Sequence, residues 1–281
     1  MSNNFLSLPE KYSNEEKSKV VIVPVPYDKT STWQKGSSKA PKAIIEASKN
    51  LELYDIETDS EVYEQGIHTA PSIKVDEDSP ESMVQEVEST ITKCIKKNKF
   101  TIAIGGEHSV SIGSIYAHSK NYKDLTILQL DAHADLKYSY NNSKYNHACV
   151  MARAKENCPI VQVGIRSLDI SEKESIDENK IFYAKDIHNN TDWIDNVIKQ
   201  LTKNVYITID LDVFDPSLIS TGTPEPGGLT WYPILELLKK VSQEKNIVGF
   251  DIVELLPGKN KSPDFLAAKL IYKILSYKFK I

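Results

Sequence analysis

The sequence reads FTIAIGGEHS over residues 100–109, LTILQLDAHAD over 125–135 and VYITIDLD over 205–212. Each stretch opens with a run of five or six mostly apolar or β-branched residues, which is typical of a strand buried on both faces of a parallel sheet. Each run then gives way to aspartate, glutamate or histidine. Because unpaired carboxylates are costly beside a buried strand, these endings predict a functional site.

The rest of the chain repeats this alternation of apolar runs and helical patterns. The predicted strands are Val20–Val25, Phe100–Ile104, Leu125–Leu130, Ile160–Val163, Val205–Ile209 and Ile247–Val253. The predicted helices are Pro41–Ser48, Ser82–Lys97, Ser109–Ala117, Trp193–Leu201, Ile234–Ser242 and Asp264–Tyr277. This order predicts an α/β fold with a mostly parallel sheet covered on both faces. In such folds functional residues lie at the carboxyl ends of the strands.

Length and composition restrict the class of protein. The chain has 281 residues and its motifs span positions 108 to 254, so we expect one domain over residues 1–281. A formal net charge of −5 argues against nucleic-acid or anionic-membrane partners. Three cysteines without CxxC spacing, a polar start and the lack of a long apolar run favour a cytoplasmic protein without a membrane span.

Two histidines and four aspartates follow the three strands. If the chain stays extended there, side chains two residues apart share one side and converge. The Gly105-Gly106 pair predicts a tight turn with backbone angles that other residues resist. The candidate residues are His108, Asp131, His133, Asp135, Asp210 and Asp212.

Four carboxylates at one place would repel and raise one another's pKa values, unless cations lie between them. Two divalent ions would balance the four negative charges. Oxygen and imidazole ligands without thiolate suit Mn²⁺, with Fe, Co, Ni or Zn as alternatives. A cap, a turn or a core histidine explains any one motif equally well. The three motifs together favour a two-metal site.

Two more residues are candidates for the same site. His147 follows the polar loop Tyr138–Tyr145, and its alternative role is that of a solvated loop histidine. Glu254 ends an apolar strand, and its alternatives are a helix cap or a lysine partner. The remaining histidines are interpreted as structural or surface residues: His68, His118 and His188.

Taken together, the motifs resemble those of the ureohydrolases, the family of arginase, agmatinase and formiminoglutamase. GGEHS at 105–109, DAHAD at 131–135 and DLD at 210–212 stand in the family's order. The resemblance extends from PVPYD at 24–28 to AAKL at 267–270. It implies a three-layer α/β/α domain around an eight-stranded, mostly parallel sheet, assembled as a homotrimer or homohexamer.

The resemblance also implies two Mn²⁺ ions per subunit. The ligands of the first ion would be His108, Asp131, Asp135 and Asp210. The ligands of the second would be His133, Asp131, Asp210 and Asp212. Asp131 and Asp210 would therefore bridge the ions.

The implied reaction is attack on a guanidinium carbon by a hydroxide that bridges the two ions. Asp135 would hydrogen-bond the nucleophile and relay its proton, Glu254 would pair with the guanidinium, and His147 would exchange protons with solvent. PVPYD and the PDFLAA stretch at 263–268 look most like agmatinases, so we expect agmatine to be cleaved to putrescine and urea. HAC at 147–149, where many agmatinases have HGT, keeps four alternatives open: N1-aminopropylagmatine, arginine, another guanidino acid and formiminoglutamate.

Two other classes of protein are compatible with parts of the pattern. A metal-dependent deacetylase on a related fold usually holds one catalytic metal with fewer carboxylates. A non-catalytic relative commonly loses ligands. The complete set of six candidate ligands disfavours both classes.

Overall fold

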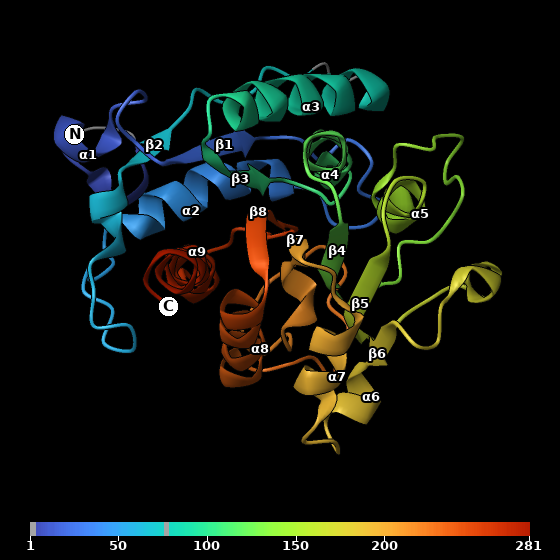
Figure 1. The fold of residues 1–281 in the computed structure, drawn as a ribbon. Helices are drawn as coiled ribbons and strands as arrows, with labels where there is room; N and C mark the ends of the chain where they lie inside the picture. The colour runs from blue at the N-terminus through green and yellow to red at the C-terminus, as the bar shows by residue number, and fades with distance from the viewer. Residues whose placement is uncertain (1–3, 76–78) are drawn as a thin grey trace.

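The computed structural model describes residues 4–75 and 79–281. Over these residues the chain forms one sheet of eight parallel strands, in the spatial order β2-β1-β3-β8-β7-β4-β5-β6 (Figure 1). The strands are β1 Val20–Val25, β2 Ile67–Thr69, β3 Phe100–Gly105, β4 Leu125–Leu130, β5 Ile160–Ile165, β6 Ile181–Tyr183, β7 Asn204–Asp210 and β8 Asn246–Val253. The α/β fold and the eight-stranded parallel sheet are thus confirmed.

The six strands predicted from the apolar runs are the six long ones. All residues of β1, β3, β4 and β5 are buried, as expected for strands covered on both faces. The two edge strands, β2 and β6, escape the pattern because each has three residues, two of them only partly buried. An edge strand has one neighbour in the sheet and needs no continuous apolar run.

Helices cover both faces of the sheet (Figure 1). The α-helices of the described residues are α1 Glu10–Ser13, α2 Ala40–Ser48, α3 Pro80–Lys96, α4 Val110–Asn121, α5 Val150–Lys155, α6 Ala184–Ile187, α7 Trp193–Gln200, α8 Trp231–Glu244 and α9 Ser262–Lys280. Their short 3-10 helices are η1 Phe5–Ser7, η2 Ser37–Lys39, η3 Val62–Gln65, η4 His147–Cys149, η5 Ile170–Ser175 and η6 Leu211–Val213.

Each face of the sheet has its own apolar core. Helices α2, α7, α8 and α9 pack in one core, and α3, α4 and α5 pack in the other. Side chains of one strand alternate between them: Val20 and Ile22 of β1 join the first core, and Val21 and Val23 join the second. The molecule therefore has three layers, as predicted.

Strand β8 is the last strand in the described chain but lies in the middle of the sheet. It pairs with β3 on one side and with β7 on the other. The carboxyl ends of β3, β8, β7 and β4 consequently lie side by side at one edge of the sheet. Three of these strands run into the predicted motifs, and the fourth runs into Glu254.

The glycine pair at the end of β3 is required for a different reason from the predicted one. Neither Gly105 nor Gly106 has a positive φ, so the expectation of an unusual backbone turn is wrong. A Cβ atom on Gly106 would lie 2.0 Å from the carbonyl oxygen of Tyr27, and one on Gly105 would lie 2.2 Å from Cγ2 of Val110. The glycines are needed because the loop after β1 and helix α4 approach the backbone closely.

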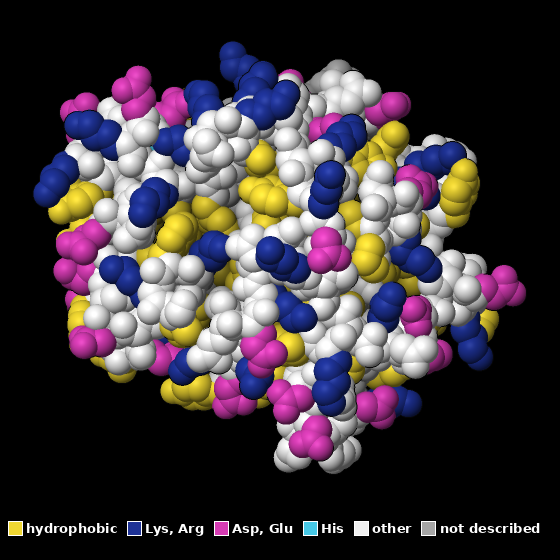
Figure 2. Space-filling view, in the orientation of Figure 1, with side chains coloured by type: hydrophobic (Ala, Val, Ile, Leu, Met, Phe, Trp, Pro, Cys, Tyr) yellow, Lys and Arg dark blue, Asp and Glu magenta, His cyan; other side chains and the backbone are white. Residues whose placement is uncertain are grey.

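Charges of both signs are interspersed on the surface. Figure 2 shows lysines and carboxylates mixed over one face of the molecule. This mixture agrees with the formal net charge of −5, and the absence of a nucleic-acid partner stays a prediction. Among the described helices, none has the length and apolar character needed to cross a bilayer.

Candidate metal centre and cavity

The predicted histidines and aspartates meet at the carboxyl ends of β3, β4 and β7, but the extended backbone predicted for them is wrong. After β4 the chain turns, and Asp135 has φ +52°, in the left-handed region. After β7 the residues Leu211–Val213 form η6, whose N-cap is Asp210. Turns, rather than strand alternation, therefore aim these side chains at one point.

His108 lies at the centre of a first group of ligands and is buried. Its Nδ1 atom lies 2.9 Å from Oδ2 of Asp135, 3.1 Å from Oδ2 of Asp131 and 3.5 Å from Oδ2 of Asp210. None of these contacts has hydrogen-bond geometry, and Nδ1 has no hydrogen-bond partner among the described residues. A buried nitrogen that faces three carboxylate oxygens is an arrangement that a divalent cation satisfies.

The other ring nitrogen of His108 fixes the tautomer. Nε2 lies 2.9 Å from Oγ1 of Thr208, whose hydroxyl donates to Oδ1 of the buried Asp251 at 2.7 Å. Because the hydroxyl proton points to Asp251, the hydroxyl accepts the N–H of Nε2. The lone pair of the neutral ring is then on Nδ1 and faces the carboxylates, as metal ligation through Nδ1 requires.

His133 forms a second group with Asp131 and Asp212. Its Nδ1 atom lies 2.8 Å from Oδ2 of Asp212 and 3.7 Å from Oδ1 of Asp131. In each group the potential ligand atoms lie within 4.8 Å of one another. Asp131 belongs to both groups, since Oδ2 faces His108 and Oδ1 faces His133. The donor set and its geometry therefore fit two adjacent cations that share Asp131.

Hydrogen bonds hold the carboxylates in place. The side-chain amide of Gln129 donates to Oδ2 of Asp131 at 2.7 Å, and the backbone N–H of His133 donates to Oδ1 at 2.6 Å. The N–H of Ala132 donates to Oδ1 of Asp212 at 2.9 Å. These donors orient the oxygens while leaving them negatively charged.

The crowding of charges shifts the pKa values of the cluster. Burial and the carboxylates of Asp212 and Asp135 raise the pKa of Asp131 to about 7. Burial and the carboxylates of Asp212 and Asp131 raise the pKa of Asp210 well above its usual range. Burial alone would lower the pKa of the His133 imidazole, but Asp212 and Asp131 raise it to about 10. The cluster thus favours positive charge, which protons or metal ions can supply.

A cavity of about 300 Å³ opens over the two groups. Asp131 and Asp212 lie buried beside its floor. The predicted residues that line it are His108, His133, Asp135, Asp210, His147 and Glu254. The structure therefore brings all eight predicted site residues to one place.

Glu254 reaches the cavity from the end of β8. Its backbone has φ +66°, and its N–H donates to the carbonyl of Gly106 at 2.7 Å. One carboxylate oxygen, Oε1, accepts the N–H of His108 at 2.9 Å. Burial and the nearby carboxylate of Glu107 raise the pKa of Glu254 to about 8. A cation placed in the cavity would favour its ionised form.

Two residues that contact the ligands, Gln129 and Thr208, and a third that contacts Thr208, Asp251, were not predicted. Gln129 and Thr208 each lie two residues before a predicted ligand, Asp131 and Asp210, on the same strand. A polar side chain with this spacing was the signal available in the sequence. Asp251 has a similar place, three residues before Glu254 in an otherwise apolar strand.

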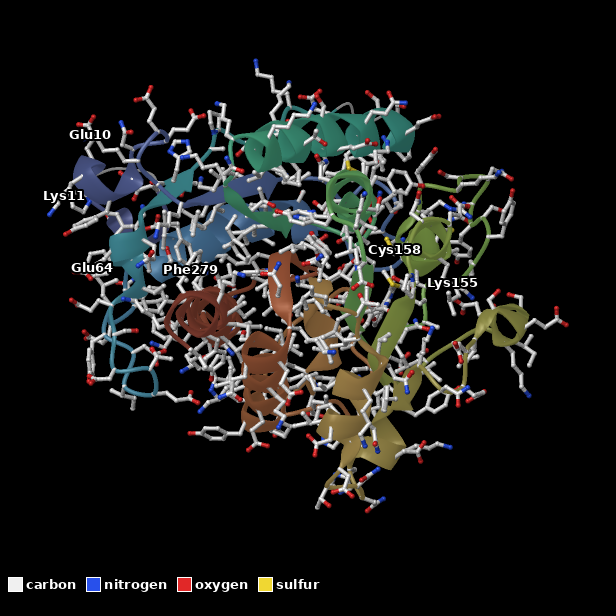
Figure 3. All side chains as sticks on the ribbon, viewed as in Figure 1. Glu10, Lys11, Glu64, Lys155, Cys158 and Phe279 are labelled. Atoms are coloured by element: carbon white, nitrogen blue, oxygen red, sulfur yellow. The ribbon has the colours of Figure 1, made fainter. Side chains whose placement is uncertain are left out.

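A second cavity, of about 380 Å³, lies at the opposite end of the sheet, near Lys155 and Cys158 at the start of β5 (Figure 3). Burial raises the pKa of the Cys158 thiol to about 11, and burial raises that of Cys149 to about 11 as well. Neither sulfur belongs to a group of potential metal ligands in the described part of the chain. The two groups of potential metal ligands in the described part of the chain both lie at the carboxyl ends of the strands.

Comparison with known proteins gives one consistent result. A model of the arginase family matches residues 18–276. The chain is 36% identical to the N(1)-aminopropylagmatine ureohydrolase of Synechocystis sp., over 98% of this chain and 96% of that protein. It is 31% identical to the agmatinase of Pyrococcus horikoshii, over 91% and 90% of the two chains. The crystal structure of the agmatine ureohydrolase of Thermoplasma volcanium superposes with a TM-score of 0.90 at 32% identity, over 100% of this chain and 95% of that one.

Proposed function

The chain belongs to the arginase family, a family of hydrolases that act on guanidino groups, and from this premise we propose that it is a ureohydrolase that cleaves agmatine to urea and putrescine. One observation carries the proposal. The cavity has two overlapping His/Asp groups on its floor and a further carboxylate, that of Glu254, on its wall. The first feature suits a pair of divalent cations, and the second suits the guanidinium of the substrate.

The residues that would hold the metal pair are those predicted from the sequence. We propose Mn²⁺ for both ions, since the donors are carboxylate oxygens and imidazole nitrogens without thiolate. Two divalent ions held there would supply a hydroxide nucleophile near neutral pH, because divalent cations lower the pKa of bound water. The proposed ligands are His108, Asp131, His133, Asp135, Asp210 and Asp212.

Three residues of the chain would handle the substrate and its protons. Glu254 would bind the guanidinium through a charge-assisted pair and hold its carbon above the cluster. Hydrolysis at that carbon would replace its bond to the amine nitrogen with a bond to an oxygen atom from water. Asp135 would carry the nucleophile's proton to the departing nitrogen, so that the C–N bond breaks and urea and a primary amine form. His147 would exchange protons between the cavity and solvent.

N1-aminopropylagmatine is a second candidate substrate. The observation that favours it is the 36% identity with relatives named as its ureohydrolases in Synechocystis sp. and Thermus thermophilus. This molecule has the same guanidinium and a longer amine tail. Tyr140 and Asp169 line the same cavity and both contact the ammonium of Lys137, whose place the additional amine of the tail would take.

A urea-release screen on protein reconstituted with Mn²⁺ tests the proposal. The substrates are agmatine, N1-aminopropylagmatine, arginine, guanidinobutyrate and formiminoglutamate. We expect urea from the first or second. Urea from arginine alone would make the substrate wrong, and formamide from formiminoglutamate would make the reaction wrong.

A further inference from the structure

The β1–α2 loop contacts His147 at two atoms through one side chain, that of Thr30. Oγ1 of Thr30 accepts the backbone N–H of His147 at 3.1 Å. The same oxygen lies 3.2 Å from Nδ1 of the His147 ring. One hydroxyl therefore ties both the backbone and the ring of this histidine to a segment more than a hundred residues away in sequence.

We propose that Thr30 is a positioning residue that fixes the ring and the tautomer of His147 during proton transfer. This inference rests on the proposed function, in which His147 exchanges protons between the cavity and solvent. It adds a residue from a loop that contributes none of the proposed ligands.

The hydrogen-bond pattern of Thr30 is fully satisfied when the ring proton of His147 lies on Nε2. A threonine hydroxyl has one proton and two lone pairs. The backbone N–H of His147 takes one lone pair of Thr30, and the hydroxyl proton can then point to Nδ1 of the neutral ring. Nδ1 is an acceptor in this arrangement, so the ring proton is on Nε2, the nitrogen left for the cavity that His147 lines.

A hydroxyl also suits the protonated ring. When Nδ1 carries a proton, it can donate to the second lone pair of Thr30, and the hydroxyl proton rotates away. The same contact thus holds His147 before and after it takes up a proton. Valine has nearly the same shape as threonine but can do neither.

Both partners lie on segments with fixed backbone. Oδ2 of Asp28 accepts the N–H groups of Gly36 and Ser38 at 2.8 and 3.3 Å, which closes the loop that contains Thr30. On the other side, Oδ1 of Asn146 accepts the N–H of Ala148 at 3.1 Å and caps η4, where His147 is the first residue. The hydroxyl therefore joins two preorganised segments.

An aromatic ring supports His147 from a second direction. The ring of Tyr140 packs edge to face against it, with centroids 6.0 Å apart and an interplanar angle of 85°. Among the described residues, Thr30 is nevertheless the only side chain with a hydrogen bond to the His147 ring. Loss of the hydroxyl would leave the ring packed but free to turn.

The test compares Thr30→Val, Thr30→Ser, His147→Ala and the double variant Thr30→Val/His147→Ala, each loaded with Mn²⁺ and assayed by urea release. We expect Thr30→Val to lower kcat about tenfold with KM within about twofold, because hydrogen bonds that hold a catalytic group contribute mainly to the chemical step. Thr30→Ser should restore most of kcat. His147→Ala should lower kcat by about a hundredfold or more, and the double variant should be no slower than His147→Ala alone.

Ser31→Ala is the matched control. Its hydroxyl belongs to the same loop but has no hydrogen-bond partner among the described residues, so kcat and melting temperature should stay at wild-type values. A Thr30→Val enzyme with wild-type kcat would overturn the proposal, and so would losses that multiply in the double variant. If His147→Ala itself keeps full activity, the proposed function is at fault in its use of His147. If His147→Ala loses activity but Thr30→Val keeps the wild-type kcat, the proposed function stands and only the positioning role of Thr30 is wrong.

A spectroscopic measurement is independent of activity and of metal. The chain has six histidines, so the ¹⁵N signals of the His147 ring can be assigned by comparison with His147→Ala. In metal-free protein at alkaline pH we expect Nδ1 to be the unprotonated nitrogen in the wild type. Thr30→Val should show a mixture of tautomers. A wild-type ring with its proton on Nδ1 would contradict the inference.

Discussion

At the scale of single residues, several side chains and backbone conformations of the site are energetically unfavourable by themselves. Asp131 is fully buried among other carboxylates, and its pKa of about 7 reflects both burial and its neighbours. Asp135 and Glu254 have positive φ values, which few non-glycine residues adopt without compensation from their surroundings. Both features are typical of residues that serve ligand binding rather than stability.

Asp131→Asn should remove metal binding. Asp131 faces both histidine nitrogens, and an amide has neither the charge nor the second anionic oxygen to replace it. Metal analysis after dialysis against Mn²⁺ should find about two ions per chain in the wild type and few or none in the variant. Asp177→Asn removes an exposed carboxylate far from the cluster and should keep the full complement. Two tightly bound ions in Asp131→Asn would contradict the assignment.

Glu254→Gln should separate metal binding from turnover. The glutamine keeps the shape of the side chain and can still accept the N–H of His108, but it cannot form a charge-assisted pair with a guanidinium. We expect full metal content and a fall in kcat/KM of about a hundredfold or more. Unchanged kinetics would show that Glu254 is not the guanidinium partner.

The ligands could be predicted from the sequence because their side chains interrupt apolar strands abruptly. Their mode of convergence could not be predicted, since distant residues hold both turns: the N–H of Met151 donates to the carbonyl of Asp135, and the guanidinium of Arg166 donates to that of Asp212. Thr30 gives no signal at all in the sequence. It is one hydroxyl residue in a polar loop, and its partner is far along the chain.

At the scale of elements, helix α4 contains a polar contact within an apolar layer. His118 of α4 is buried, with Nδ1 2.7 Å from the carbonyl oxygen of Ser114 and Nε2 3.1 Å from Oγ1 of Thr101 on β3. A Cβ atom on Gly249 of β8 would lie 2.4 Å from Nε2, so a glycine is needed opposite the ring. The histidine thus joins the helix to the sheet, as the structural interpretation of its sequence position predicted.

His118 should make the stability of the fold depend on pH. Burial lowers the pKa of its imidazole to about 4, whereas an unfolded histidine titrates near 6.5. Between these values the unfolded chain binds a proton that the folded chain does not, so the stabilisation is complete above about pH 6.5 and is lost as the pH falls toward 4. The loss amounts to about 3 kcal/mol.

Urea unfolding of wild type and His118→Gln at pH 7 and pH 4 measures this effect. The wild type should lose about 3 kcal/mol more than the variant over this range, because the other titrating groups are shared by both proteins. Equal losses would mean that the pKa of His118 is the same in the folded and unfolded chains.

Helix α9 is tied to the segment between α2 and η3 by a second polar contact. Lys273 lies 2.9 Å from Oδ2 of Asp55 and 2.6 Å from Oε2 of Glu57, and it is 6% exposed. Lys273→Met would leave the carboxylate of the buried Asp55 without its cation. We expect a loss of about 3 kcal/mol in the free energy of unfolding.

The control for this element is Lys240→Met. Lys240 pairs with Glu244 on the exposed side of α8, where such pairs contribute less than about 1 kcal/mol. Chemical denaturation of both variants gives the comparison. Similar free energies of unfolding for Lys273→Met and Lys240→Met would mean that the ion pairs of Lys273 on α9 are solvated and weak.

The central elements could be predicted from sequence, and the peripheral ones could not. Burial on both faces makes β4 and β7 mostly apolar or β-branched, and runs of this kind can be recognised in the sequence. Strands β2 and β6 form at the edges because they pair with β1 and β5. Such pairing leaves no pattern in the local sequence from which the strands could be predicted. The expected number of eight strands came from the family resemblance, because the apolar runs alone indicate six.

At the scale of the whole molecule, the proposed metal pair would stabilise the fold by binding only to the folded state. The ligands come from β3, β4 and β7 and lie far apart in an unfolded chain. At a free Mn²⁺ concentration a hundred times Kd, the gain is about 3 kcal/mol. Calorimetry should find a melting temperature that rises with Mn²⁺ and falls with a chelator, and Asp131→Asn should not respond. A wild type that does not respond would contradict a site formed only by folding.

The central position of β8 in the sheet determines when, during synthesis, the two halves of the site can be joined. Before β8 is synthesised, the sheet can pair only as two blocks, β2-β1-β3 and β7-β4-β5-β6, with no hydrogen-bonded strand between them. His108 follows the first block, and the four aspartates follow the second. A nascent chain on the ribosome therefore presents the ligands as two separate halves. The group around His108 can therefore form only when β8 joins the two blocks, whereas Asp131, His133 and Asp212 all follow strands of the second block.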